Sequence, residues 1–197
     1  MSPFLPQARS PGESSGSRKL PKYFTYSEIK KLLSHRLKTD DPNAYYLTTF
    51  LWRTGVRVSE ALAVKVGDIN FVDHSIRILT LKRKDGHVRY IPFNGEFSGL
   101  TLAWIQKHNL VATDKLFSIS RKTAYNWIAT ACIKAGINDG RAHPQTLRHS
   151  FAVNLLSQNF PTSILKELLG HATLSQTLIY TQLVDTDPLK LFKGLKF

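Results

Sequence analysis

Three short segments of this 197-residue chain hold residue types suited to binding a phosphate. The first reads TGVRVSE and places Arg57 directly after a glycine break, with Glu60 three residues further on to orient it. A buried arginine held by a carboxylate can offer its remaining donors to a phosphate as a planar fork. Taken alone, the segment is more typical of an exposed arginine at an ordinary helix entry. Arg57 is therefore a candidate that other segments must support.

The second and third segments add another arginine, three histidines and a tyrosine. The second reads AHPQTLRHSFA, a polar helix start that carries Arg148 and His149. The third reads LLGHATLSQTLIYT, in which His171 follows a helix-capping glycine and Tyr180 comes nine residues later. A single histidine or tyrosine in such a place is most often structural. The order and spacing of all three segments carry more information than any one of them.

Together the three segments closely resemble the tyrosine recombinase family, the phage-integrase and Xer-like DNA recombinases. The resemblance covers roughly residues 20–185 and implies the fold of that family's catalytic domain. It implies that Tyr180 is the nucleophile, attacking a scissile DNA phosphate to give a 3′-phosphotyrosine and a free 5′-hydroxyl, with no metal, ATP or other cofactor. It also implies that Arg57 and Arg148 stabilise charge on that phosphate and that His171 donates a hydrogen bond to it.

The resemblance further implies a lysine on a β-hairpin that protonates the leaving 5′-oxygen as general acid. Lys82 and Lys84 both qualify. We favour Lys84 because it directly precedes an Asp-Gly turn and lies eight positions before Pro92, the spacing typical of the family. Arg83 and the remaining lysine are then expected to bind the DNA backbone.

One position departs from the family pattern. Three residues before the second arginine the family usually has histidine, sometimes lysine, and this chain has Gln145. Glutamine can hydrogen-bond a phosphate or the tyrosine hydroxyl, but it cannot accept a proton near neutral pH. General-base help for Tyr180 is therefore open, with His143 as an alternative candidate. His149 and Glu60 are expected to be supporting residues.

The charge balance points to the same kind of partner. The chain has 27 Lys and Arg against 14 Asp and Glu, a formal net charge of +13. Such an excess favours a polyanion, because clustered cations release counterions from phosphates. By resemblance, double-stranded DNA is the partner, and one helix start approaches its major groove through Arg121, Lys122, Tyr125 and Asn126. For any one of these residues a solvated charged surface is an equal alternative.

Family resemblance also predicts assembly as a homotetramer on two synapsed DNA sites, with the free chain left open as a monomer. The tail of about residues 186–197 contains Leu189, Leu191 and Phe192, an apolar face that could dock on a neighbouring protomer. Residues 1–20 are rich in proline, glycine and serine and predict a flexible leader or linker remnant before a catalytic domain over 21–197. We expect either a piece of a longer protein or a short member of the family without the usual N-terminal DNA-clamping domain.

Periodicity and capping signals predict a mostly α-helical α+β domain with a small antiparallel sheet. A hairpin is predicted from two β-rich stretches, 74–79 and 87–91. The predicted helices are 25–37, 42–52, 59–64, 96–108, 120–135, 144–158 and 162–169, with a further short one ending near Tyr180.

Several classes of protein are disfavoured. The single cysteine, Cys132, has apolar neighbours and predicts a buried thiol in a reducing compartment. The chain has no apolar run long enough for a bilayer and no signal peptide pattern, so a cytoplasmic protein without a membrane partner is expected. The histidines and cysteine show no metal-ligand spacing, and no Gly-x-Ser-x-Gly hydrolase motif occurs.

Two other functions remain as alternatives. The first is an accessory or regulatory DNA-binding protein that keeps the fold without strand transfer, which Gln145 would favour. The second is a type IB topoisomerase-like enzyme that relaxes DNA by the same phosphotyrosine step. The sequence specifies neither the target DNA nor the choice among integration, excision, inversion and resolution.

Overall fold

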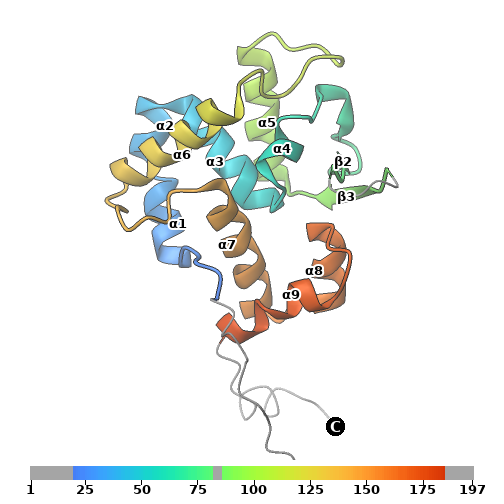
Figure 1. The fold of residues 1–197 in the computed structure, drawn as a ribbon. Coiled ribbons are helices and arrows are strands. Elements are labelled where there is room, and N and C mark those ends of the chain that lie inside the picture. The colour runs from blue at the N-terminus through green and yellow to red at the C-terminus, as the bar shows by residue number, and fades with distance from the viewer. Residues whose placement is uncertain (1–19, 82–85, 185–197) are drawn as a thin grey trace, which may run out of the picture.

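The computed structural model describes residues 20–81 and 86–184, which form nine α-helices and a small antiparallel sheet (Figure 1). The helices are α1 (Tyr26–Leu32), α2 (His35–Asp40), α3 (Pro42–Thr54), α4 (Val58–Ala61), α5 (Gly95–Lys107), α6 (Arg121–Lys134), α7 (Pro144–Ser157), α8 (Thr162–Leu169) and α9 (Ser175–Leu178). The strands are β1 (Ile69–Asn70), β2 (Ser75–Leu79) and β3 (Val88–Pro92), and short 3₁₀ turns cover Val66–Asp68 and Thr181–Leu183. The predicted fold class is confirmed. The predicted leader and tail fall mostly outside the described residues and stay predictions.

Helix α3 forms the centre of the domain. Its start follows from Asp41, whose side chain caps the backbone N–H of Ala44, and from Pro42 in the first turn. The helix is buried over most of its surface and packs against α2, α6 and α7. Tyr46 stacks on Trp104 of α5 with ring centroids 4.5 Å apart. This aromatic packing holds the N-terminal half of α3 against α5.

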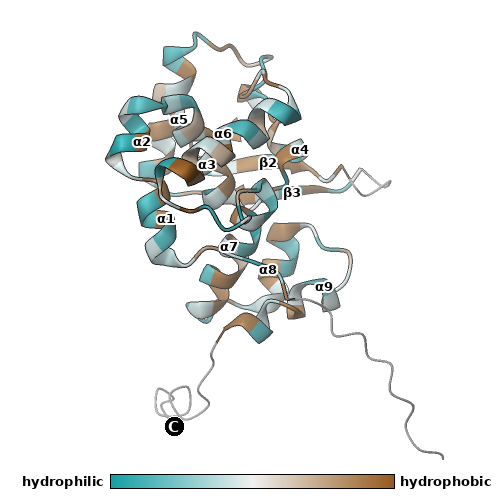
Figure 2. Cartoon of the chain, turned by 60° about the vertical axis from the view of Figure 1, so that its left-hand side comes forward, coloured by the Kyte–Doolittle hydropathy of each residue, from teal (hydrophilic) through white to brown (hydrophobic). Residues whose placement is uncertain are grey.

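The three strands follow one another in the sheet in the order β1-β2-β3, with antiparallel pairing throughout. In β2, Ile76 and Ile78 point into the core, and in β3 the inward positions are Arg89 and Ile91. Figure 2 shows hydrophobic colour along β2 and β3 and hydrophilic colour on the outer turns of α2. The sheet therefore covers the core with one face, and one of its inward positions is a charged residue.

Two elements differ from their prediction. The helix expected over 25–37 is interrupted: α1 ends with Leu33 as its C-cap, and Ser34 in extended backbone precedes α2. Serine favours helix starts over helix interiors, which explains the break. The predicted hairpin has a third strand, β1, whose Ile69 pairs with Ile76. At two residues, β1 is too short to show the alternation by which strands are recognised.

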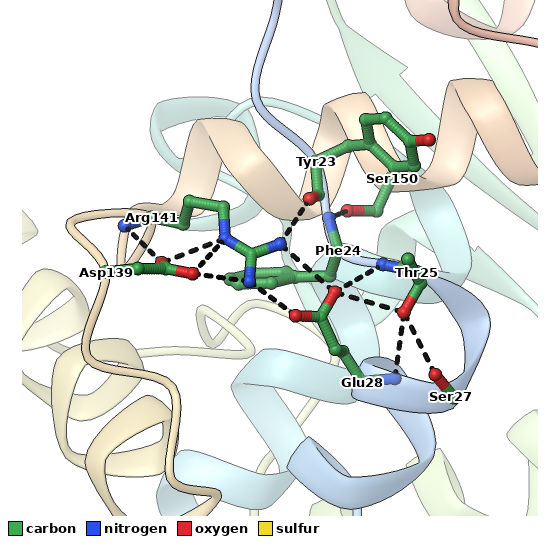
Figure 3. A network of polar contacts seen from close by, with 8 residues as sticks. All are labelled: Tyr23, Phe24, Thr25, Ser27, Glu28, Asp139, Arg141 and Ser150. Atoms are coloured by element: carbon green, nitrogen blue, oxygen red, sulfur yellow. Dashed lines mark hydrogen bonds and ion pairs between the residues drawn. The ribbon is translucent and has the colours of Figure 1, made fainter.

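A cluster around Arg141 connects residues 23–28 to the rest of the domain (Figure 3). Arg141 pairs with Glu28 and Asp139, and it donates to the backbone carbonyl of Tyr23 over 2.7 Å. The hydrogen bond from Arg141 lowers the pKa of Glu28 to about 2, although partial burial opposes that shift. Glu28 also completes the predicted capping box of α1. We call Tyr23, Glu28, Asp139 and Arg141 the Arg141 cluster.

Other sequence expectations can be compared with the described part of the chain. Cys132 is buried as predicted, and burial raises the pKa of its thiol to about 11. Among residues 20–81 and 86–184, none of the helices combines the length and apolar character needed to cross a membrane. Within the same ranges, no three potential metal ligands of the His, Cys, Asp and Glu types come together.

Candidate active site

The first part of the site is the turn between α3 and α4. Gly55 ends α3 with a φ of 63°, and a Cβ atom placed there would lie 2.2 Å from the ring of Phe151 on α7. Both the left-handed backbone and this close approach require glycine. Arg57 follows, and Glu60 accepts hydrogen bonds from its backbone N–H (2.9 Å) and from its Nη1 (3.1 Å). Glu60 thus contacts Arg57 where the sequence predicts it.

The second part is Arg148 in the second turn of α7. Only 1% of this residue is exposed, yet its guanidinium contacts two backbone carbonyls: Nη1 donates to Gly55 (2.9 Å) and Nη2 to Leu169 (2.6 Å). These carbonyls lie at the C-terminal ends of α3 and α8, where the helix dipole is negative. Burial and the nearby Arg57 lower the pKa of Arg148 to about 10, so it stays protonated at neutral pH.

The third part begins at the end of α8. Gly170 has a φ of 63° and ends α8. The next residue, His171, lies beside Tyr180. His171 is 8% exposed, and its Nδ1 lies 2.8 Å from the Thr177 hydroxyl. Burial, followed by the charges of Arg148 and Arg57, lowers the pKa of His171 to about 3. His171 is therefore neutral at physiological pH.

Tyr180 lies between the rings of His149 and His171, with centroid distances of 5.5 Å and 6.3 Å. It is 3% exposed, and its hydroxyl is 2.9 Å from Nδ1 of His149. Burial raises the pKa of Tyr180, while Arg148 and Arg57 pull it down. The pKa of His149 falls to about 4 because of burial and the adjacent Arg148. A neutral histidine thus contacts the hydroxyl that the sequence marks as nucleophile.

The structure brings six predicted residues into one connected site. They are Arg57, Glu60, Arg148, His149, His171 and Tyr180. Gln145 and His143 have exposed side chains at the start of α7, and the ring of His143 lies 6.2 Å from that of Tyr125. The contact with the Tyr180 hydroxyl comes from His149 instead.

The remaining predicted residues lie elsewhere or cannot be placed. Lys82, Arg83 and Lys84 are outside the described residues. On α6, Arg121, Lys122 and Asn126 are exposed and Tyr125 is half-buried.

Sequence reasoning missed Arg89. This residue is buried on β3, and it contacts Glu60, the Thr80 hydroxyl and the carbonyl of Leu168. A signal was present: in the run Val-Arg-Tyr-Ile, strand alternation puts Arg89 on the same face as Ile91. A charged residue on the inward face of a strand predicts a buried partner.

Comparison with known proteins agrees with this geometry. The phage integrase family matches residues 22–186, and the chain belongs to that family. It is 30% identical over 174 residues to a tyrosine recombinase of Pseudothermotoga lettingae, covering 86% of this chain and 59% of that relative. It is 31% identical over 198 residues to the tyrosine recombinase XerD of Mycobacterium leprae, covering 90% of this chain and 61% of the relative.

Solved structures show the same fold. A XerH site-specific recombinase bound to palindromic difH substrate, in a post-cleavage complex, has a TM-score of 0.74 and 25% identity, covering 92% of this chain and 54% of the other. The catalytic domain of bacteriophage HP1 integrase has a TM-score of 0.67 at 21% identity, covering 88% of this chain and 95% of that one. The chain spans 59% and 61% of the two sequence relatives named above.

Proposed function

We propose that this chain is the catalytic part of a site-specific DNA recombinase, in which Tyr180 cleaves and rejoins strands through a 3′-phosphotyrosine. The observation that carries the proposal is the contact between the Tyr180 hydroxyl and His149, beside Arg148, which no carboxylate of residues 20–81 and 86–184 contacts directly. Membership of the phage integrase family and relatives named as tyrosine recombinases support it.

In the proposed step, the Tyr180 oxygen forms a bond to the scissile phosphorus and the bond from phosphorus to the 5′-oxygen breaks. The tyrosine proton must leave and the 5′-oxygen must gain one, so each end of the reaction needs a proton carrier. The phosphodiester energy is kept in the new linkage, and attack by a 5′-hydroxyl reverses the step.

His149 is the proposed proton acceptor for Tyr180. Its Nδ1 is within hydrogen-bond distance of the hydroxyl, and its lowered pKa keeps the imidazole neutral at physiological pH. In the tautomer with the ring proton on Nε2, Nδ1 accepts the hydroxyl proton. The approach of a phosphate anion would raise the proton affinity of His149 and stabilise the transfer. In this scheme Gln145 is not the general base and serves only as a hydrogen-bonding group.

Arg57, Arg148 and His171 are the proposed phosphate ligands. Charge grows on the non-bridging oxygens during the reaction, and preorganised cations in a buried pocket stabilise it strongly. When the Thr177 hydroxyl donates to Nδ1 of His171, the ring proton lies on Nε2, which can then donate to the phosphate.

Lys84 remains the proposed general acid for the 5′-oxygen, with Lys82 as the alternative, and no metal or cofactor is required by this scheme. Lys84→Ala is expected to stall cleavage of normal DNA but not of DNA with a 5′-bridging sulfur, which leaves without protonation. If Lys82→Ala has this effect instead, the assignment of the two lysines is reversed.

Double-stranded DNA is the proposed substrate and a homotetramer on two synapsed sites the proposed assembly. A groove of about 900 Å³ among α1, α3, α5 and α7, with Trp52, Leu100 and Phe151 in its lining, offers apolar surface for the tail of a neighbouring protomer. Deleting residues 186–197 is expected to impair synapsis while leaving monomer folding intact. Unaltered synapsis after this deletion would overturn the docking role.

The test uses nicked DNA duplexes with a randomised recombination site, because the target sequence is unknown. The nick releases a short fragment after cleavage and traps the protein on the DNA. We expect adducts that survive denaturation and that Tyr180→Phe abolishes. Absence of adducts would leave a DNA-binding accessory protein, and adducts without exchange between paired sites would leave a topoisomerase-like enzyme.

A further inference from the structure

The guanidinium of Arg89 joins three separate elements behind the site. Its Nη2 pairs with Glu60 of α4 at 2.7 Å, its Nη1 donates to the Thr80 hydroxyl at 2.7 Å, and its Nε donates to the Leu168 carbonyl of α8 at 2.8 Å. The side chain is 5% exposed. Because all three nitrogens already donate to protein atoms, Arg89 is poorly placed to bind a phosphate itself.

Glu60 connects Arg89 to Arg57. Arg89 donates to both carboxylate oxygens, from Nη2 to Oε2 at 2.7 Å and from Nη1 to Oε1 at 3.4 Å. The Arg57 side chain donates to Oε1 through a single nitrogen at 3.1 Å, and the Arg57 backbone N–H donates to Oε2 at 2.9 Å. Although burial opposes it, the bond and charge of Arg89, together with Arg57, hold the pKa of Glu60 below its usual value. The buried carboxylate is thus shared between two cations. Arg57 keeps donors that Glu60 does not occupy.

Arg89 also holds the turn that leads to His171. Two successive backbone carbonyls at the end of α8 accept hydrogen bonds from arginines. Arg89 donates to the carbonyl of Leu168, and Arg148 donates to that of Leu169. At the next residue, Gly170, a Cβ atom would lie 2.9 Å from Nη1 of Arg89. The guanidinium therefore packs directly against the backbone that places His171.

We propose that Arg89 is a positioning residue for strand cleavage, which keeps Arg57 free to bind the scissile phosphate by sharing Glu60 and fixes the turn before His171. The proposal rests on the proposed function, because it assigns how that same site is held together. Without Arg89, Glu60 has one cationic partner left and competes with the phosphate for the donors of Arg57. The chemical step should suffer more than DNA binding.

The test compares single-turnover adduct formation at saturating DNA, using a site selected from the randomised duplexes. Arg89→Met keeps the length of the side chain and removes its donors. We expect the rate constant to fall about 10–100-fold, as for other residues that orient groups contacting the reacting atoms, with the Kd for DNA changed less than threefold. A rate within threefold of wild type, for folded protein, would overturn the proposal.

The matched control is Arg77→Met on the neighbouring strand. Arg77 also pairs with an acid, Asp68 at 3.2 Å, but its side chain is 51% exposed and lies outside the site. We expect its rate constant at saturating DNA to equal that of wild type. An equal loss in both variants would attribute the effect to the sheet as a whole and overturn the positioning role.

Coupling distinguishes positioning from a general structural role. Arg89 is proposed to act through Arg57. The loss of rate in the double variant Arg89→Met/Arg57→Lys should therefore be about tenfold smaller than the product of the losses in the two single variants. A loss in the double variant equal to the product of the two single losses would contradict the proposal. If Arg89→Met does not fold, Arg89→Lys and Thr80→Val carry the test, each with an expected three- to tenfold loss at wild-type DNA affinity.

The same assay keeps the two proposals apart. Wild-type protein without adducts, or adducts that persist in Tyr180→Phe, would overturn the proposed function and this inference with it. Wild-type adducts that Tyr180→Phe abolishes, together with an unchanged rate in Arg89→Met, would overturn this inference alone.

Discussion

Two arginines seven residues apart, Arg141 and Arg148, have opposite surroundings. Arg141 lies among the carboxylates of Glu28 and Asp139, and these hydrogen bonds raise its pKa. Among the residues that the structure describes, the hydrogen bonds of the Arg148 side chain go to two backbone carbonyls, and burial beside Arg57 lowers its pKa. The charge of Arg141 is neutralised within the protein, whereas that of Arg148 is left for an anion. The first arrangement suits a residue that stabilises the fold, and the second suits the phosphate-binding role proposed for Arg148.

The largest expected effect comes from Arg148. Arg148→Lys keeps a positive charge but cannot donate to Gly55 and Leu169 while also presenting a fork to a phosphate. We expect adduct formation to fall about 10³-fold, since removal of one preorganised donor costs about 10²–10³. Single-turnover rates measure this effect. A loss of less than tenfold would show that the carbonyl-held arginine is not the phosphate ligand.

The next effect concerns the proton acceptor. His149→Gln retains a hydrogen bond to Tyr180 but not a basic nitrogen, so the cleavage rate should fall about 10²-fold, within the usual range for general-base catalysis. Gln145→His, at the exposed family position, should change the rate less than threefold. If Gln145→His instead speeds adduct formation strongly, Gln145 limits the reaction and His149 is not the main acceptor.

Arg141 should show the reverse behaviour. Arg141→Met removes the partner of Glu28 and the tie to the Tyr23 carbonyl, and should lower the free energy of unfolding by about 1–2 kcal/mol, between surface and buried ion pairs. Urea denaturation measures this loss. The rate of adduct formation per folded molecule should stay within threefold of wild type, and a specific loss of rate would break the division between the two arginines.

The last expected effect is on the pH dependence of stability. In the folded protein the pKa values of His149 and His171 are about 4 and 3, below the usual 6.5, so the unfolded chain binds more protons. Unfolding free energy should therefore fall as the pH drops from about 6.5 towards 4. The pKa of Glu28 is about 2 instead of 4.5, so its contribution is lost only between about pH 4.5 and 2.

Variants separate these two pH ranges. His171→Asn should flatten the slope between about pH 6.5 and 4, and Glu28→Gln should flatten it below about pH 4.5, both measured by urea unfolding at a series of pH values. If His171→Asn leaves the upper slope unchanged, the buried pocket does not hold its histidines neutral.

Much of the site could be predicted because its residues stand in short local patterns. The turn at Gly55, the support of Arg57 by Glu60 and the cap at Gly170 all depend on neighbours within a few residues. The contacts of Arg148 with Gly55 and Leu169 span 93 and 21 residues and go to backbone atoms, which carry no side-chain signature. Backbone ligands of this kind follow only from the packing of α3, α7 and α8.

Arg89 and β1 mark a second limit of local reasoning. The partner of Arg89, Glu60, lies 29 residues away and was already assigned to Arg57, so one carboxylate had to be recognised as serving two cations. Strand β1 has only two residues, and its pairing with β2 defines it. Ser34 indicates the interruption between α1 and α2, because serine favours a helix start. The apolar spacing on both sides of Ser34 nevertheless favours one continuous helix.

The most direct measurement is mass spectrometry of the protease-digested adduct formed on nicked DNA. The account predicts a nucleotide 3′-phosphate attached to the peptide that contains Tyr180. Attachment to any other residue, or adduct-free protein under conditions where it binds DNA, would contradict the claim that this pocket activates Tyr180 against a phosphate.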